Sequence, residues 1–128
     1  MGGQERPGSY RDLRVWQQSM ELAAQCYVVS RSFPNEERFG LTGQLRRACV
    51  SVPCNIAEGS GRSTRREYAQ FLHVARGSLR ELDTLMLLSI DVGIAERCKV
   101  EPLLALSESV GRQLLALIRS LGAVRSDD

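Results

Sequence analysis

Residues 44–67 read QLRRACVSVPCNIAEGSGRSTRRE, and this stretch predicts the end of one helix, a turn and the start of another. Apolar side chains recur every three or four residues as far as Ile56, as on one face of a helix. Gly59 is placed to end that helix in a left-handed conformation, with residues 59–61 forming the turn. Thr64 and Glu67 have the spacing of a capping box that opens the next helix. The stretch therefore predicts two consecutive helices joined by a tight connection.

Four segments of the chain show helical periodicity in all. Their apolar positions are Leu13, Trp16, Met20, Ala23 and Tyr27, with Ala24 and Val28 beside them; Leu41, Leu45, Ala48, Cys49, Val52 and Ile56; Tyr68, Phe71, Leu72, Ala75, Leu79, Leu82 and Met86; and Val100, Leu103, Leu104, Val110, Leu114, Leu117, Ile118 and Leu121. No segment alternates with the period of two that is typical of strands. Because the connections are short, consecutive helices should pack antiparallel. We predict an all-α, up-down-up-down four-helix bundle over residues 10–122, with a disordered leader at 1–9 and a frayed tail at 123–128.

Proline and glycine residues indicate helix ends and two irregular positions. Pro34 should end the first helix, since the residue before a proline resists helical geometry. Gly93 should end the third helix in a left-handed conformation, and Pro102 suits the first turn of the fourth. Pro53 lies inside the second helix and removes a backbone donor there, so we predict a kink. Gly77 lies inside the third helix, where either the close approach of another helix or accidental tolerance would explain it.

Charge is distributed unevenly along the chain, although the net charge is only +2. Residues 40–80 carry seven arginines against two acids, a net +5, whereas residues 81–128 carry a net −3. The arginines of this basic block are Arg46, Arg47, Arg62, Arg65, Arg66, Arg76 and Arg80. Arginines around a helix N-terminus could hold an anion, such as the phosphates of RNA or DNA. Alternatively, they could form ion pairs with Glu58, Glu67 and the acidic residues of another helix or subunit.

A polar strip follows one flank of the second helix. Its members are Gln44, Ser51, Asn55 and Glu58. We expect Asn55 and Glu58 to hydrogen-bond the turn at residues 59–62, so that they form a structural turn together with Gly59 and Gly61. Glu58 would also pair with Arg62 or a neighbouring arginine. The alternative is that the strip lines a polar pocket in which Glu58 is the acid.

A second group of apolar residues lies on the same helix, away from its main apolar face. This group is Val50, Pro53, Cys54 and Ala57. A helix that is apolar on two sides needs two partners, and within one four-helix domain the second side would face water. We therefore predict an oligomer interface at this group, with scattered small surface residues as the alternative.

No motif in the sequence indicates catalysis, a metal or a cofactor. The four cysteines lack CxxC spacing and the histidine partners of a zinc site, and His73 is the only histidine. No serine lies in a nucleophile elbow, and residues 59–62 lack the lysine of a phosphate-binding loop. The first ten residues, MGGQERPGSY, lack the apolar core of a signal peptide, and no segment has the length of a membrane span. We expect a non-enzymatic cytoplasmic protein with reduced thiols, no cofactor, no metal and no membrane partner.

Several short motifs occur in a fixed order along the chain. They are Tyr10-x-x-Leu13-x-Val15-Trp16-Gln17, Phe33-Pro34-x-Glu36, Gly40-Leu41-x-x-Gln44-Leu45-Arg46-Arg47-Ala48, Asn55-Ile56-Ala57-Glu58-Gly59-x-Gly61-Arg62 and Phe71-Leu72-x-x-Ala75-x-Gly77-Ser78-x-x-Glu81-Leu82. Over about residues 10–94 the chain resembles the bacterial four-helix-bundle family named after proteins encoded in intervening sequences of 23S ribosomal RNA genes. The resemblance implies a bundle that assembles into a closed ring, a pentamer, without an established biochemical activity. The fold is also similar to that of basic-surfaced pentameric accessory proteins of diversity-generating retroelements, which associate with nucleic acid and a reverse transcriptase.

Three functional hypotheses follow from the residues and the resemblance. The first is a non-enzymatic, ring-forming bundle that binds RNA or DNA through the arginines of the basic block. The second is a protein-directed adaptor or scaffold, with an unknown protein partner, in which the basic block meets acidic subunits. The third is a small-molecule or hydrolytic enzyme, which would need a deep cavity around Asn55 and Glu58.

Overall fold

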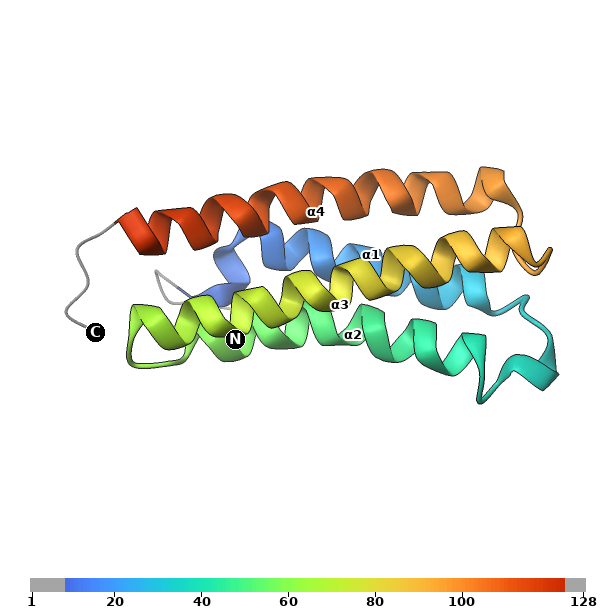
Figure 1. The fold of residues 1–128 in the computed structure, drawn as a ribbon, viewed down its shortest axis with the longest axis horizontal. Coiled ribbons are helices and arrows are strands. Elements are labelled where there is room, and N and C mark those ends of the chain that lie inside the picture. Colours follow the sequence, from blue (N-terminus) through green and yellow to red (C-terminus); the bar gives the residue numbers. More distant parts are fainter. Residues whose placement is uncertain (1–8, 124–128) are drawn as a thin grey trace, which may run out of the picture.

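The computed structural model describes residues 9–123, which form four long helices and two short 3-10 helices (Figure 1). The elements are η1 (Tyr10–Asp12), α1 (Arg14–Ser30), η2 (Asn35–Glu37), α2 (Leu41–Ser60), α3 (Arg65–Asp91) and α4 (Arg97–Ala123). No strand occurs in this range, so the predicted all-α four-helix bundle is confirmed. Apart from Ser9 and Ala123, the predicted leader and tail lie outside the described residues. Ser9 caps η1 by accepting a hydrogen bond from the Arg11 backbone N–H.

The helices form a ring of four neighbours. Each helix packs against the next one in the chain, α4 closes the bundle against α1, and α2 with α3 forms the most extensive pair. Figure 1 shows the colour gradient reversing direction from each helix to the next, so that consecutive helices run in opposite directions. The α1–α2 connection and the α3–α4 connection therefore lie at one end of the bundle, and the α2–α3 turn lies at the other end.

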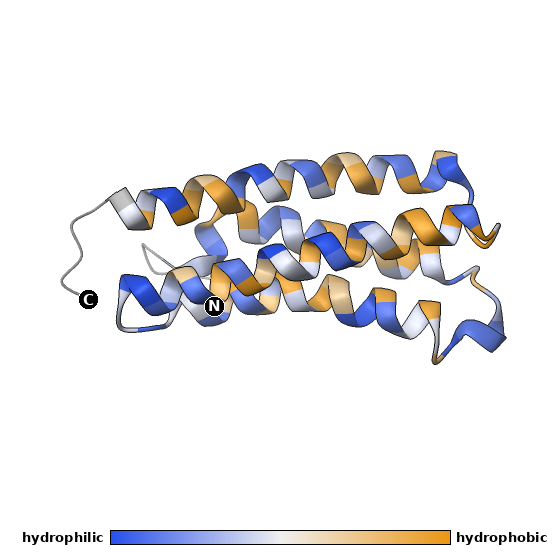
Figure 2. Cartoon of the chain, in the orientation of Figure 1, coloured by the Kyte–Doolittle hydropathy of each residue, from blue (hydrophilic) through white to orange (hydrophobic). Residues whose placement is uncertain are grey.

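The core is built from the apolar faces predicted for α2, α3 and α4. Fully buried members include Leu45, Val52, Ile56, Leu72, Leu82, Val110 and Leu114. Hydrophobic and hydrophilic residues alternate along each helix in Figure 2, as amphipathic helices require. The apolar faces of these three helices were therefore predicted correctly.

The apolar face predicted for α1 is only partly correct. The buried residues of α1 are Val15, Ser19, Leu22, Ala23, Cys26 and Ser30. Of the predicted face, Ala23 is buried and Leu13 and Trp16 are partly buried against the core, whereas Met20 is 46 % and Tyr27 is 40 % exposed. The physical reason is that two serines occupy the inward face, and both hydroxyls donate to carbonyls of their own helix, Ser19 to Trp16 and Ser30 to Tyr27. The helix thus has an inward face interrupted by serines and a second apolar face beside it.

Some predicted helix ends are confirmed and others are wrong. Thr64 accepts a hydrogen bond from the Glu67 backbone N–H at 3.1 Å, which is one half of the predicted capping box. Gly93 has the predicted positive φ of 77°. Pro102 does not lie in the first turn of α4, because α4 already begins at Arg97. Pro53 lies inside α2, and the kink there stays a prediction.

The prediction that Gly59 ends α2 in a left-handed conformation is wrong. Gly59 lies buried within the helix. A Cβ atom at this position would come within 2.8 Å of Phe71 Cβ and 3.0 Å of Tyr68 Cδ1. Gly59 therefore lets α2 and α3 approach closely. For Gly77 either a close helix or accidental tolerance was the expected explanation, and within this chain nothing lies within 4 Å of such a Cβ.

Candidate functional site

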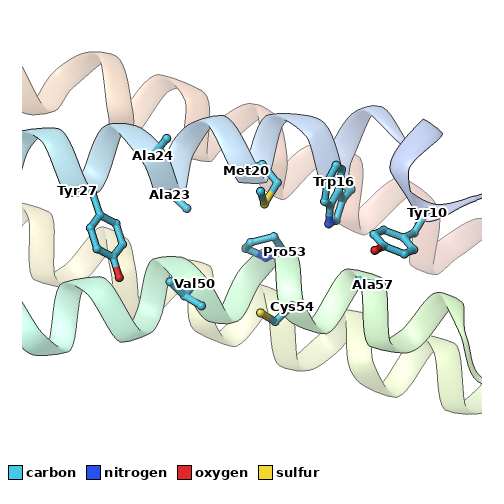
Figure 3. A pocket seen from close by; sticks show the side chains of 10 residues that line it. All are labelled: Tyr10, Trp16, Met20, Ala23, Ala24, Tyr27, Val50, Pro53, Cys54 and Ala57. Atoms are coloured by element: carbon cyan, nitrogen blue, oxygen red, sulfur yellow. The ribbon is translucent and has the colours of Figure 1, made fainter. Parts of the chain in front are cut away.

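An apolar groove of about 490 Å³ runs between α1 and α2 (Figure 3). Its walls are Tyr10, Trp16, Met20, Ala23, Ala24, Tyr27, Val50, Pro53, Cys54 and Ala57. All four residues of the predicted oligomer interface are in this set, and they face the second apolar face of α1. The structure thus joins two features of the sequence that were interpreted separately, because Trp16, Met20 and Tyr27, which were predicted as part of the α1 core, line this groove.

Both sides of the groove are fixed by local packing. The Tyr10 ring, placed by η1, meets Trp16 edge to face with 5.3 Å between ring centroids. Met20 from α1 and Pro53 from α2 point toward one another across the groove in Figure 3. Val50 remains 39 % exposed at the rim, close to the values of Met20 and Tyr27. The groove is therefore an apolar surface that water contacts in the single chain.

Arg46, a predicted anion ligand, links α2 to α1. Its Nε donates to Ser30 Oγ at 2.9 Å, and a terminal guanidinium nitrogen donates to the Tyr27 carbonyl at 3.5 Å. The guanidinium also lies 4.7 Å from the centroid of the Tyr27 ring, which is a cation–π geometry. Arg46 therefore holds Tyr27 in place at one end of the groove.

Arg62, a second predicted anion ligand, forms the ion pair that was its alternative interpretation. One of its guanidinium nitrogens lies 2.8 Å from Glu58 Oε2, and the guanidinium lies 4.5 Å from the Phe71 ring centroid. Both side chains of the ion pair are substantially exposed, so the pair contributes little to stability. The predicted pairing of Glu58 with Arg62 is confirmed.

Asn55 does not bond the turn as predicted. Its amide nitrogen donates back into α2, to the Ser51 carbonyl at 2.8 Å and to Ser51 Oγ at 3.0 Å. Ser51 Oγ also lies 2.7 Å from Ser78 Oγ on α3. The reason is the helical spacing of four residues, which places Asn55 above Ser51 on the α2–α3 contact. Within the polar strip, Ser51 therefore joins α2 to α3, and Gly61 caps α2 through backbone bonds.

The seven arginines of the basic block are spread along the bundle. Arg46 lies fourteen positions before Ser60, the last residue of α2, which corresponds to roughly 21 Å at the rise of an α-helix, and Arg62 lies beyond that end. Arg65 and Arg66 begin α3 beside Arg62, and the remaining residues are Arg47 on α2 and Arg76 and Arg80 on α3. Among residues 9–123, no ion pair joins Arg47, Arg76 or Arg80 to a carboxylate.

The titratable side chains that are wholly or partly buried contact other protein groups. Cys26 and Cys49, which we call the buried thiol pair, are free and almost fully buried, as predicted. The hydrogen bond to Cys49 and burial raise the pKa of Cys26, so this thiol stays protonated. Asp83 accepts a hydrogen bond from Ser107 Oγ at 2.6 Å, and burial raises the pKa of Asp83. In the described part of the chain no three His, Cys, Asp or Glu residues are grouped to hold a metal ion.

The comparison with known families decides what the chain is related to. Residues 11–116 match the family described as 23S rRNA-intervening sequence protein. The chain belongs to this family. The match extends into α4, beyond the motifs that carried the resemblance.

A solved structure from Bacteroides thetaiotaomicron supports the fold of this 23S rRNA-intervening sequence protein family member. That structure is described as a protein with unknown function from the S23 ribosomal protein family. It matches with a TM-score of 0.76 over 82 % of this chain and 95 % of that chain, at 23 % sequence identity. At this identity the likeness shows the fold alone. No curated protein matches the sequence.

None of the groove residues before α2 was predicted as functional; the largest of those in α1 are Trp16, Met20 and Tyr27. A signal was present in the sequence, because their spacing places them on one face of α1 and the residues Val15, Leu22 and Cys26 on another. Comparing the two faces would have identified α1 as a helix with two apolar sides, as was done for α2. No helix in residues 9–123 has an apolar stretch long enough to span a bilayer.

Proposed function

We propose that the chain is a non-enzymatic, self-associating helical bundle whose contact surface is the apolar groove between α1 and α2. The observation that carries this proposal is the exposure of Met20, Tyr27 and Val50 around one groove. Removing apolar surface from water contributes about 25 cal/mol per Å², so covering the groove stabilises an assembly. A cytoplasmic location belongs to the same proposal and is supported by the four free cysteines.

The partner in this contact is a second copy of the chain. The basic block at 40–80 carries a net charge of +5 and residues 81–128 carry a net −3, so different segments of two copies attract one another. Glu81 and Asp91 are exposed and take part in no ion pair among residues 9–123. Surfaces that differ in this way favour a head-to-tail contact, which closes into a ring when the rotation allows it. The family resemblance makes a pentamer the expected ring.

Light scattering coupled to size-exclusion chromatography tests this proposal. We expect the wild type to have a mass that is a multiple of 14.2 kDa. Val50→Asp places a charge in the groove and should give the mass of a monomer. Val74→Asp is the matched control, because Val74 is 53 % exposed on α3 outside the groove, and it should keep the wild-type mass. A wild type that is monomeric at every concentration, or a Val74→Asp variant that alone dissociates, contradicts the proposal.

A second candidate function is binding of a nucleic-acid backbone, which is favoured by Arg47, Arg76 and Arg80, because none of them forms an ion pair within residues 9–123. Each phosphate that such a cation neutralises releases counterions and makes the affinity dependent on salt. A single-stranded and a structured RNA, each labelled with a fluorophore, are suitable probes for anisotropy measurements between about 50 and 200 mM salt, a range over which phosphate contacts lose much of their affinity. The solved relative belongs to a family described as ribosomal, which motivates the choice of a structured RNA.

Two double variants that remove the same number of charges show whether binding depends on the assigned arginines or only on the net charge. Arg76→Gln with Arg80→Gln should lower the slope of log affinity against log salt by about 2. Arg97→Gln with Arg112→Gln removes two arginines of α4 that pair with Glu101 and Glu108, and it should keep the wild-type slope. Equal losses in both double variants contradict the assigned surface. If neither RNA binds measurably at the lowest salt concentration, the chain is a self-associating scaffold that does not bind nucleic acid.

A further inference from the structure

A polar pocket of about 270 Å³ lies at the connection between α1 and α2, separate from the apolar groove. Its polar lining residues are Ser30, Arg31, Asn35, Arg38, Thr42 and Arg46. Three of these six carry guanidinium groups, and none of the three forms an ion pair among the described residues. The connection also holds Glu36 and Glu37, but neither lines the pocket, and Glu37 accepts a hydrogen bond from the Leu41 backbone N–H. The pocket therefore concentrates positive charge around a small volume.

The same pocket also contains a buried hydroxyl group, that of Thr42, that has no hydrogen-bond partner among the described residues. Its side chain is only 9 % exposed, and its hydroxyl oxygen is buried without a hydrogen-bond partner. It is the only side-chain nitrogen or oxygen in the described residues with this property. A buried hydroxyl without a partner is costly, and native structures rarely keep one without a ligand, a water or a functional role.

Two of the three guanidinium groups, those of Arg38 and Arg46, already have contacts that position them. Ser30 Oγ is buried, donates to the Tyr27 carbonyl and accepts from Arg46 Nε at 2.9 Å, so Arg46 is held against the pocket wall. The Arg38 guanidinium lies 5.1 Å from the centroid of the exposed Phe39 ring. Thr42 also lies in the first turn of α2, where the helix dipole favours an anion. Cations that are already positioned lose less side-chain entropy when an anion binds.

We propose that this pocket binds a phosphate group, with the guanidinium groups of Arg31, Arg38 and Arg46 as its counter-charges and Thr42 Oγ1, once its side chain rotates toward the pocket, as a hydrogen-bond donor. A phosphate carries up to two negative charges and several acceptor oxygens, whereas a monocarboxylate carries one charge and two oxygens. The phosphate is therefore the better match for three guanidinium groups and one hydroxyl donor. The volume also leaves room for part of an attached organic group. The ligand class is therefore inorganic phosphate or a small phosphate monoester. This proposal goes beyond self-association and RNA binding and does not depend on either.

Thermal unfolding and isothermal titration calorimetry test the proposal with the intact chain. The probes are sodium phosphate, adenosine 5′-monophosphate, adenosine and sodium acetate, each compared with sodium chloride at the same ionic strength. We expect phosphate and the monophosphate to raise Tm and to give a saturable binding heat, whereas adenosine and acetate do neither. Tighter binding of adenosine 5′-monophosphate than of phosphate would identify a monoester as the ligand, and the reverse order would identify inorganic phosphate. Equal effects of phosphate and chloride overturn the proposal.

Variants of Thr42 separate a ligand-binding role from a structural one. Thr42→Val removes the orphaned hydroxyl, so its Tm without phosphate should equal or exceed that of the wild type. Its phosphate affinity should fall by about ten-fold, the change expected for one hydrogen bond to a charged group. Thr42→Ser keeps the hydroxyl and should keep most of the affinity. A Thr42→Val variant that binds phosphate as the wild type does overturns the assignment.

A matched pair of arginine variants gives the remaining control. Arg38→Gln should lower the phosphate affinity by ten-fold or more, because it removes a cation that lines the pocket. Arg112→Gln changes the net charge equally but removes a cation of α4 that pairs with Glu108, and it should bind phosphate as the wild type does. Equal losses in these two variants would indicate a nonspecific charge effect and overturn the site.

Discussion

Substituting alanine for two helical glycines should change the free energy of unfolding in opposite directions. In Gly59→Ala the new Cβ would lie 2.8 Å from Phe71 Cβ, and the Tyr68 carbonyl oxygen is only 3.1 Å away. Neither atom belongs to the flexible end of a side chain, so α2 and α3 must move apart. Such overpacking costs about 1–3 kcal/mol, and we take the upper end, about 3 kcal/mol, because the contacts are rigid. The helix propensity of alanine offsets at most about 1 kcal/mol, so the net destabilisation is about 2 kcal/mol.

Gly77→Ala introduces the same methyl group where nothing lies within 4 Å. Only the propensity term remains, so this variant should be more stable by about 1 kcal/mol. The two variants should therefore differ by about 3 kcal/mol. Urea unfolding followed by circular dichroism at 222 nm measures both values, at one protein concentration because association contributes to apparent stability. Equal stabilisation by the two substitutions would refute the close approach of α2 and α3 at Gly59.

Three further predictions concern a carboxylate, a cation and the thiols. Burial raises the pKa of Asp83 in the folded state, so its ionisation lowers stability as pH rises through the interval above its unfolded pKa. Asp83→Asn should thus have a higher Tm than wild type at pH 7 and an equal Tm at pH 3, and a higher wild-type Tm at pH 7 would contradict this sign. Arg46→Met loses the bond to Ser30 and the cation–π contact, and should lower the free energy of unfolding in urea by about 1–2 kcal/mol. With a thiol-specific reagent, the exposed Cys98 should react first and the buried thiol pair should react only when the chain unfolds. Cys54 lies in the groove, so its reaction should become slower as protein concentration rises. Equal reaction rates for all four thiols would contradict the packing.

The four-helix architecture could be predicted from sequence because the inward face of most helices is periodic and aliphatic. In α2, α3 and α4, large aliphatic residues recur with the helical period, and burial follows that period. The prediction failed in α1, where Ser19 and Ser30 occupy the inward face and satisfy their hydroxyls within the helix. Periodicity counts a serine as polar, so it selected the adjacent face with Trp16, Met20 and Tyr27.

The candidate site was only partly predictable for a similar reason. The apolar residues of α2 were recognised as a second face, but the groove also needs α1, and the pairing of the two faces depends on packing between helices. The sequence correctly indicated that position 59 requires glycine. The reason is the close contact with α3 and not the backbone conformation of Gly59. Arg46 could not be assigned from sequence, because its partners Ser30 and Tyr27 lie on another helix.

Fluorescence of Trp16 during dilution tests the central claim most directly, since it is the only tryptophan in the chain and lies in the groove. Acrylamide quenching of this residue and the mass from sedimentation should be measured at the same protein concentrations. If copies associate through the groove, quenching should increase on dilution at the concentrations where the mass falls toward 14.2 kDa. A mass that falls on dilution while the quenching of Trp16 stays constant would place the contact elsewhere and contradict the account.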